Sequence, residues 1–381
     1  MSSRPLRVVH LAQVRWFNAE AQYALDLAEG MSRLGHRVTY LTQTGSPAAR
    51  QARARGVETV EAWGRNGNGP LAALAAPAAL RLGRLLRRAG ADALEVHRPE
   101  GLLPIALAAR AAGIPVIRIR GDMRPVRSDP LNRYLYRRIL SAVVASNSAV
   151  ERGLRERIGR IPNLLTIHGG VDPEVFSPQG PTNDVRPALG FPPGSFLVGI
   201  LGRLSEIKGH YDFLAAARLA SEGTRAFFVI LNKEPVDREE ELRRAVAADP
   251  VLRGRVGFLG HRADLPAVLR SFDLGVVAST ASEANCRVGL EWMASGVPLV
   301  ATTIGVLPDL VLPGRTGLLV PPGDPGALAE AISALARAPE EARRLGAAGR
   351  ARVCERFTVD RCARAHEELI RRVRAAARSA A

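Results

Sequence analysis

Apolar residues in the first half of the chain fall into short β-branched runs, separated by longer segments in which they recur every three or four positions. Short runs of this kind are typical of buried parallel strands, and the longer segments of amphipathic helices. The segment 21–35 predicts a helix that ends at a glycine. The regular alternation indicates a doubly wound α/β sheet. Strands are predicted at 7–13, 37–43, 93–98, 115–121 and 142–147.

The second half of the chain repeats this pattern after a stretch rich in Pro, Gly and Asn at 176–195, which predicts a linker. We therefore expect two Rossmann-like domains, 1–176 and 177–355, and a C-terminal helix at 356–381 that is long enough to cross back to the first domain. Ligands of such domains bind at the carboxyl ends of the strands, in the cleft between the two. Strands are predicted at 196–203, 226–233, 255–261, 274–280, 298–304 and 316–322.

Length and composition support this division into two domains and also indicate where in the cell the protein is found. A chain of 381 residues suits two cores better than one. It contains no apolar run of 18 residues, so no transmembrane helix is expected. The N-terminus reaches a strand at once and lacks a signal-peptide pattern. The three cysteines form no disulfide or metal framework. We expect a cytoplasmic protein.

Positive charge is concentrated in the first half. The net charge is +16, of which residues 1–176 carry +12 and residues 177–381 carry +4. Such a field attracts acidic acceptors, an anionic membrane surface or nucleic acid. The alternative is an arginine-rich genome, since 51 of the 53 basic residues are Arg. Within this half, 70–88 predicts a basic amphipathic helix that either docks on anionic lipid or packs on the sheet with a solvated face.

A basic loop follows the first strand of the second half. Residues 202–210, GRLSEIKGH, have glycines that let the backbone approach an anion, and Arg203 and Lys208 bring two positive charges to it. Lysine occurs only twice in the chain, which favours a specific role for Lys208. The spacings of a P-loop and of a dinucleotide fingerprint are both absent. The loop predicts a diphosphate contact, with a solvated turn as the alternative.

The segment 282–298, SEANCRVGLEWMASGVP, predicts a loop followed by a helix that runs to about residue 295. Ser282 or Asn285 would cap that helix. Its first amides, around Arg287, Val288 and Gly289, would form an anion site that the Arg287 guanidinium reinforces.

Two glutamates flank this anion site. Glu291 lies one turn into the helix, where its carboxylate can accept hydrogen bonds from a ribose diol. Glu283 lies in the loop before the helix and would reach the sugar on the other side of a diphosphate. The alternative, in which both are helix-start acids that complement the dipole, fits Glu283 but not Glu291.

Several motifs in one order resemble the family 4 glycosyltransferases, which are retaining enzymes of the GT-B fold. The resemblance rests on Glu283-x7-Glu291, on GRLSEIKG, and on the segments 23–42, 169–178 and 294–311. It implies that Arg203 and Lys208 grip the donor diphosphate, that Glu291 holds the nucleotide ribose and that Glu283 lies at the donor sugar. The amides of Val288 and Gly289 would lie on the phosphates.

The resemblance also implies the chemistry. Catalysis would be electrostatic, through Arg203 and Lys208, with Glu283 at the donor sugar and Asp122 at the acceptor hydroxyl. No cofactor and no metal are expected. His10, His97 and His168 show no ligand spacing, so a structural role is expected for each.

Two departures from the family pattern affect the acceptor side. Where members often have Gly-Gly after the first strand, this chain has Asn18, which tolerates left-handed backbone and can donate to a phosphate. Where many have His-Asp, it has Gly121 and Asp122, so the role of that His is not available. Arg118, Arg120 and Arg124 make the predicted pocket unusually basic, with solvated strand-end charges as the alternative.

The segment 118–138 is similar to members assigned to lipopolysaccharide core or other envelope glycans. We therefore expect a nucleotide-diphospho-sugar donor, an anionic glycan or glycolipid acceptor, and contact with the inner face of the membrane. Two alternatives stay open: a GT-B sugar-nucleotide epimerase, and a non-catalytic protein that binds nucleotide sugars or nucleic acid. The lack of interleaved aromatic residues argues against nucleic acid.

Overall fold

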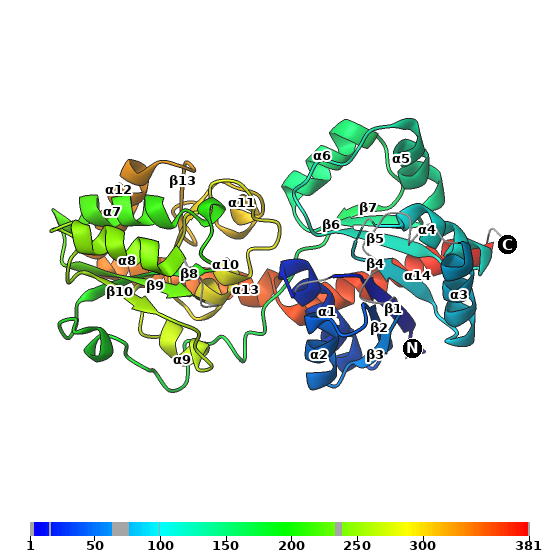
Figure 1. The fold of residues 1–381 in the computed structure, drawn as a ribbon, viewed down its shortest axis with the longest axis horizontal. Coiled ribbons are helices and arrows are strands. Elements are labelled where there is room, and N and C mark those ends of the chain that lie inside the picture. The colour runs from blue at the N-terminus through cyan, green and yellow to red at the C-terminus, as the bar shows by residue number, and fades with distance from the viewer. Residues whose placement is uncertain (1–3, 15–16, 63–75, 99, 233–237, 380–381) are drawn as a thin grey trace. The chain divides into compact units, whose positions relative to one another are not determined.

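A computed structural model describes residues 4–14, 17–62, 76–98, 100–232 and 238–379 of the chain. Its contacts divide the chain into two units (Figure 1). The first comprises Met1–Gly170 together with Val359–Ala381, and the second comprises Val171–Thr358. The sequence placed these divisions after 176 and after 355. The part of the expected basic helix at 70–75 lies outside the described residues.

The first unit contains a parallel sheet in the order β3-β2-β1-β4-β5-β6-β7. The order reverses between β1 and β4, which makes their carboxyl ends the switch point of the sheet. The strands are short, and the interior positions of β1, β4, β5 and β6 are buried, as expected where helices cover both faces. The strands are β1 Arg7–Ala12, β2 Arg37–Thr42, β3 Glu58–Glu61, β4 Ala93–Val96, β5 Val116–Arg120, β6 Ala142–Ala145 and β7 Leu164–Thr166.

Two apolar clusters hold the helices of this unit to its sheet. One cluster joins the sheet to α1, α2 and α14, and the other joins it to α3, α4, η1 and α6. The helices are α1 Ala19–Arg33, α2 Pro47–Ala54, α3 Ala76–Arg88, α4 Leu102–Ala111, α5 Pro130–Tyr134, η1 Leu135–Ile139, α6 Ser148–Ile158 and α14 Val359–Ser379.

Helix α14 is far in sequence from the rest of its unit but is part of the core. It buries Cys362, Leu369 and Ile370 against α1 and the sheet. The crossing with α1 is close, because a Cβ added at Gly30 would lie 2.9 Å from Val359 Cγ1. The C-terminal helix therefore belongs structurally to the first unit (Figure 1).

The second unit has a parallel sheet in the order β10-β9-β8-β11-β12-β13, which reverses between β8 and β11. Its strands are β8 Phe196–Gly202, β9 Ala226–Asn232, β10 Val256–Leu259, β11 Leu274–Val277, β12 Leu299–Thr302 and β13 Leu318–Val320. Both sheets confirm the predicted α/β class.

The helices of the second unit also cover both faces of its sheet. They are η2 Pro187–Leu189, η3 Glu206–Lys208, α7 His210–Ser221, α8 Arg238–Ala248, α9 Leu265–Leu269, α10 Arg287–Ala294, α11 Leu307–Leu310, α12 Pro325–Arg337 and α13 Pro339–Arg356.

Candidate functional site

Two loops meet at the switch point of the second unit. The loop after β8 passes through η3 to Gly209, and the loop after β11 runs from Ala278 to Cys286. The Thr280 amide donates to the Ile207 carbonyl at 2.9 Å and joins the two loops. Gly209 has φ +70°, and a Cβ there would lie 1.9 Å from the Ala278 carbonyl oxygen. The loop therefore needs glycine both for its backbone angle and for its close approach.

Gly209→Ala is expected to lower the free energy of unfolding by several times the cost of Gly194→Ala. Both positions have φ +70°, so both variants carry a left-handed strain of about 1–2 kcal/mol. Only at Gly209 does the added Cβ meet backbone, whereas Gly194 has open space. Chemical denaturation of the two variants measures the difference. Equal losses would contradict the proposed contact between the loops.

Glu283 lies buried where these loops meet, with 5% of its surface exposed. Its Oε1 accepts hydrogen bonds from Lys208 Nζ and from Ser279 Oγ. Its backbone carbonyl accepts from the Val306 amide at 2.8 Å. The structure thus brings together Lys208 and Glu283, which lie 75 positions apart in the sequence. The pair fixes the Lys208 ammonium group, which keeps further N–H donors for an anion.

Helix α10 begins at Arg287 and ends at Ala294. Its N-cap is Cys286 at φ +33°, so the prediction that Ser282 or Asn285 caps it is wrong. The first amides of an α-helix have no helical partner, so those of Arg287 and Val288 suit an anion, whereas the Gly289 amide faces the Cys286 thiol. Gly289 is buried. Burial also raises the pKa of the Cys286 thiol, which keeps that thiol neutral.

Glu291 is buried in α10, with only 1% of its surface exposed. Its Oε1 accepts from Arg287 Nε at 2.8 Å, one helical turn earlier. The two residues assigned separately to ribose and phosphate thus contact one another. Arg203, at the end of β8, has an exposed side chain.

The residues expected on the acceptor side lie in the first unit, around the end of β5. Arg120 Nη2 lies 3.4 Å from Asp122 Oδ1 and also donates to the Arg124 carbonyl. Asp122 Oδ1 accepts from the Arg124 amide at 3.0 Å. Arg118 and Arg120 are buried and Arg124 is exposed. Of the three arginines, only Arg124 therefore fits the alternative in which they are solvated charges at the end of a strand.

Asn18 lies apart from this group, as the N-cap of α1. Its Oδ1 accepts from the Ala21 amide at 3.0 Å. Its φ of −118° is extended, so Asn18 does not use the left-handed backbone that asparagine tolerates. Its amide nitrogen is still a potential donor to a ligand.

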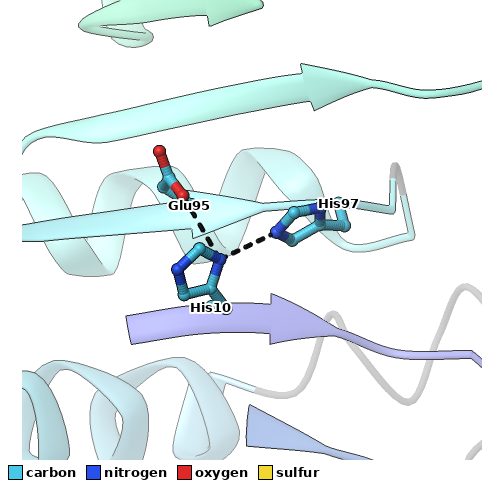
Figure 2. A group of neighbouring side chains, drawn as sticks. All are labelled: His10, Glu95 and His97. Carbon is cyan, nitrogen blue, oxygen red and sulfur yellow. Dashed lines mark hydrogen bonds and ion pairs between the residues drawn. The ribbon is translucent and has the colours of Figure 1, made fainter. Parts of the chain in front are cut away.

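A buried group that the sequence did not connect lies on the opposite face of the first sheet from Arg118. Figure 2 shows His10 on β1 with its ring nitrogen facing both Glu95 on β4 and His97 just beyond it. His10 Nδ1 lies 3.2 Å from Glu95 Oε2 and 3.1 Å from His97 Nε2. Glu95 Oε1 is 2.7 Å from Nδ1 of His366 on α14, whose Nε2 is 3.0 Å from the Tyr23 hydroxyl. The network joins α14 to the centre of the sheet.

The charges of this network follow from burial and pairing. Burial alone would lower the pKa of His366, but the adjacent Glu95 carboxylate raises it to about 10. Burial would raise the pKa of Glu95, but the imidazoles of His366 and His10 lower it. Burial lowers the pKa of His10 to about 4 and that of His97 well below its ordinary value. Near pH 7 the network holds a His366–Glu95 ion pair and two neutral imidazoles.

His10, Glu95 and His97 are the three described residues whose ligand atoms lie close enough together to hold a metal ion. Two neutral imidazoles and a carboxylate form a familiar ligand set. The charge balance argues against a cation, because protonated His366 already neutralises Glu95 and buried Arg118 adds a positive charge nearby. We read the group as structural. The sequence did carry one signal for this group: Glu95 is an acidic residue inside the apolar strand at 93–98, where a buried carboxylate needs polar partners.

Helix α3 keeps the amphipathic character expected of 70–88. Leu82 and Leu86 are buried, whereas Arg81, Arg84 and Arg88 line an open pocket of about 560 Å³ beside Glu58. Among the described residues, no helix combines the length and apolarity needed to cross a bilayer.

Comparisons with known proteins identify the family. Residues 21–175 match the model described as Glycosyltransferase Family 4, and residues 195–338 the model described as Glycosyl transferases group 1. The lipopolysaccharide core biosynthesis mannosyltransferase LpsB of Rhizobium meliloti is 31% identical over 63% of this chain and 69% of its own length. The chain belongs to the family 4 glycosyltransferases. This confirms the resemblance read from the motifs.

Further relatives agree with this assignment. The alpha-maltose-1-phosphate synthase of Mycobacterium tuberculosis is 30% identical over 57% of this glycosyltransferase and 61% of the synthase. The solved structure of Anabaena Alr3699/HepE in complex with UDP aligns over 95% of this chain and 99% of its own, with a TM-score of 0.82 and 23% identity. The GT-B fold is thereby confirmed, and the epimerase and binding-protein alternatives are not favoured.

Proposed function

We propose that this glycosyltransferase transfers a sugar from a nucleotide-diphospho-sugar to an anionic glycan or glycolipid, with retention at the anomeric carbon and without a metal. The observation that carries the proposal is the meeting of Lys208, Glu283 and the first turn of α10 at one sheet edge. A structural neighbour crystallised in complex with UDP-glucose supports the choice of donor.

In the proposed reaction the bond between the anomeric carbon and the diphosphate oxygen breaks, and a bond to the acceptor oxygen forms. Negative charge develops on the departing diphosphate. Arg203, Lys208 and the amides of Arg287 and Val288 stabilise that charge, which is the task a metal performs elsewhere. A phosphate oxygen takes the proton of the acceptor hydroxyl.

Two carboxylates and one amide would position the substrates. Glu283 accepts hydrogen bonds from hydroxyls of the donor sugar, and Glu291, with Arg287, supports the ribose. Asp122 orients the acceptor hydroxyl, and Asn18 contributes an amide donor on the acceptor side. These roles are carried over from the family resemblance. Asn18 caps α1, Arg287 and Glu291 lie on α10, and Asp122 follows β5.

The acceptor and the place of action are part of the proposal. The excess positive charge of residues 1–176 and the similarity to a lipopolysaccharide core enzyme support an anionic envelope glycan. Arg81, Arg84 and Arg88 on α3 support peripheral contact with an anionic membrane. All three cysteines are free, which suits the reducing cytoplasm, where we place the protein.

Incubation with nucleotide sugars and a set of phosphorylated and neutral oligosaccharides tests the function. Mass spectrometry is expected to find an acceptor heavier by one sugar residue, and proton NMR to find the anomeric configuration of the donor kept. The rate should be unchanged in EDTA. An inverted product, or a reaction stopped by EDTA and restored by a divalent cation, would contradict the corresponding part of the proposal.

A further inference from the structure

The inner strand β5 carries two buried arginines on one face of the first sheet. Arg118 and Arg120 are two positions apart, so their side chains leave the same face. Arg118 is fully buried and Arg120 is 6% exposed. Arginine is rarely buried to this degree without a partner of opposite charge. The strand is paired with β4 and β6 on its two sides, so the backbone has no freedom to carry these side chains outward.

The guanidinium groups have fewer acceptors than donors. Arg118 Nη1 donates to the carbonyls of Val96 and Ile119, while its Nε and Nη2 have no hydrogen-bond partner. Arg120 Nη2 donates to the Arg124 carbonyl, and its Nε also has no partner. Three buried guanidinium nitrogens are therefore without an acceptor among the described residues, and a buried donor without an acceptor is costly.

One carboxylate serves both cations. Asp122 Oδ2 lies 4.0 Å from Arg118 Nη2, and Asp122 Oδ1 lies 3.4 Å from Arg120 Nη2. A strong hydrogen bond between a guanidinium and a carboxylate measures about 2.7–2.9 Å, so both contacts are weak. The Glu20 carboxylate also acts on Arg118; its Oε2 accepts from Arg98 Nη1 at 2.6 Å, and its Oε1 has no hydrogen-bond partner. Among the described residues, neither arginine thus has a carboxylate at the distance of a strong hydrogen bond.

The burial of Arg118 adds to the cost of these weak contacts. Burial lowers the pKa of its guanidinium, and the charge of Arg120 lowers it further. Arginine remains protonated in proteins, so burying the charged Arg118 guanidinium destabilises the folded state. A second anion at this position would relieve this destabilisation.

We propose that the end of β5 is an anion subsite of the first unit, which binds a phosphate monoester or a carboxylate of the acceptor. Arg120 is the residue that contacts the anion, with its unpartnered Nε as donor, and Arg118 is the supporting charge beneath it. Asp122, 23% exposed, lies beside both arginines, and the anion binds next to it. The planar fork of arginine suits both anions.

Position in the fold supports this assignment. Arg120 ends β5, which is hydrogen-bonded to β4, one of the two strands at the switch point where ligands of doubly wound sheets bind. The inference rests on the proposed function, because it names the chemical group that the acceptor must carry. Members of the acceptor set without such a group would be poor substrates.

The test uses inorganic phosphate and acetate as probes. The melting temperature is measured in sodium phosphate, acetate and chloride of equal ionic strength at pH 7, because a ligand of the native state raises it by mass action. The background is the full chain with Arg203→Ala and Lys208→Ala, which removes the basic pair of the donor side. In this background Arg120→Gln is compared with Arg127→Gln, an arginine in the same loop whose side chain is 88% exposed.

Phosphate or acetate is expected to raise the melting temperature above that in chloride, and Arg120→Gln to weaken the apparent affinity at least tenfold, while Arg127→Gln leaves it unchanged. A larger shift with phosphate identifies a phosphate monoester, and a larger shift with acetate identifies a carboxylate. No shift beyond chloride, or the same shift in Arg120→Gln, overturns the inference. Donor binding to the otherwise wild-type chain with Arg120→Gln is measured separately, so a failed subsite is distinguished from a failed donor assignment.

Discussion

Replacing Lys208 with alanine is expected to lower kcat for sugar transfer by about 10²–10³-fold, the usual cost of removing one donor that stabilises developing charge. Glu283 holds the Lys208 ammonium group in place at the carboxyl end of the sheet. The substitution therefore removes a cation that is already positioned for the diphosphate. Steady-state kinetics with the donor at saturation measure the effect. A kcat within threefold of wild type would contradict the assignment of Lys208.

Two further variants separate catalysis from stability. Lys208→Ala leaves the buried Glu283 carboxylate without its cation, which destabilises the second unit. The double variant Lys208→Ala, Glu283→Gln removes that charge and should recover much of the free energy of unfolding while remaining inactive. Arg218→Ala removes an exposed positive charge of the same unit, on α7, and should keep full activity. Loss of activity in Arg218→Ala would point to net charge rather than to the site.

The second large effect is on stability. Glu95→Gln is expected to lower the free energy of unfolding by about 3–5 kcal/mol, because it leaves protonated His366 buried without its counter-charge. The matched control is Asp360→Asn, which breaks the exposed pair between Arg33 on α1 and Asp360 on α14. Exposed pairs contribute about 0–1 kcal/mol. Equal losses in urea denaturation of the two variants would contradict the buried ion pair.

The same network predicts how stability depends on pH. His366 has a raised pKa of about 10, so its contribution is complete below the ordinary value of 6.5 and is lost as the pH rises toward 10. His10 has a lowered pKa of about 4 in the folded protein. As the pH drops from 6.5 to 4, His10 is protonated in the unfolded chain but not in the folded one, so stability falls. Stability should therefore peak near pH 6.5. Glu95→Gln should flatten the alkaline side of the profile.

Much of the fold could be predicted because its signals are local. The strand runs at 7–13 and 196–203 match β1 and β8, and the helix predicted at 21–35 matches α1 within two residues. Strands β3 and β7 were missed. Strand β3 is an edge strand with an acidic residue at each end, and β7 is an edge strand of three residues that follows α6 closely.

The donor-side loops could also be placed from sequence, because each follows a predicted strand. The contact of Glu291 with Arg287 could have been predicted from the sequence, since positions i and i+4 of a helix are neighbours. The pairing of Glu95 with His366 was not, because 271 positions separate them and only the docking of α14 brings them together. The burial of Arg118 was equally hidden, since a charged strand end more often faces solvent.

The measurement that tests the central claim most directly is the melting temperature of the wild type and of the Lys208→Ala and Glu291→Ala variants with UDP-, GDP-, ADP- and CMP-sugars. One class of nucleotide-diphospho-sugar is expected to raise the melting temperature of the wild type by mass action and to leave both variants unchanged. If no donor stabilises the wild type, or if the variants respond as it does, the donor site proposed for the second unit is wrong.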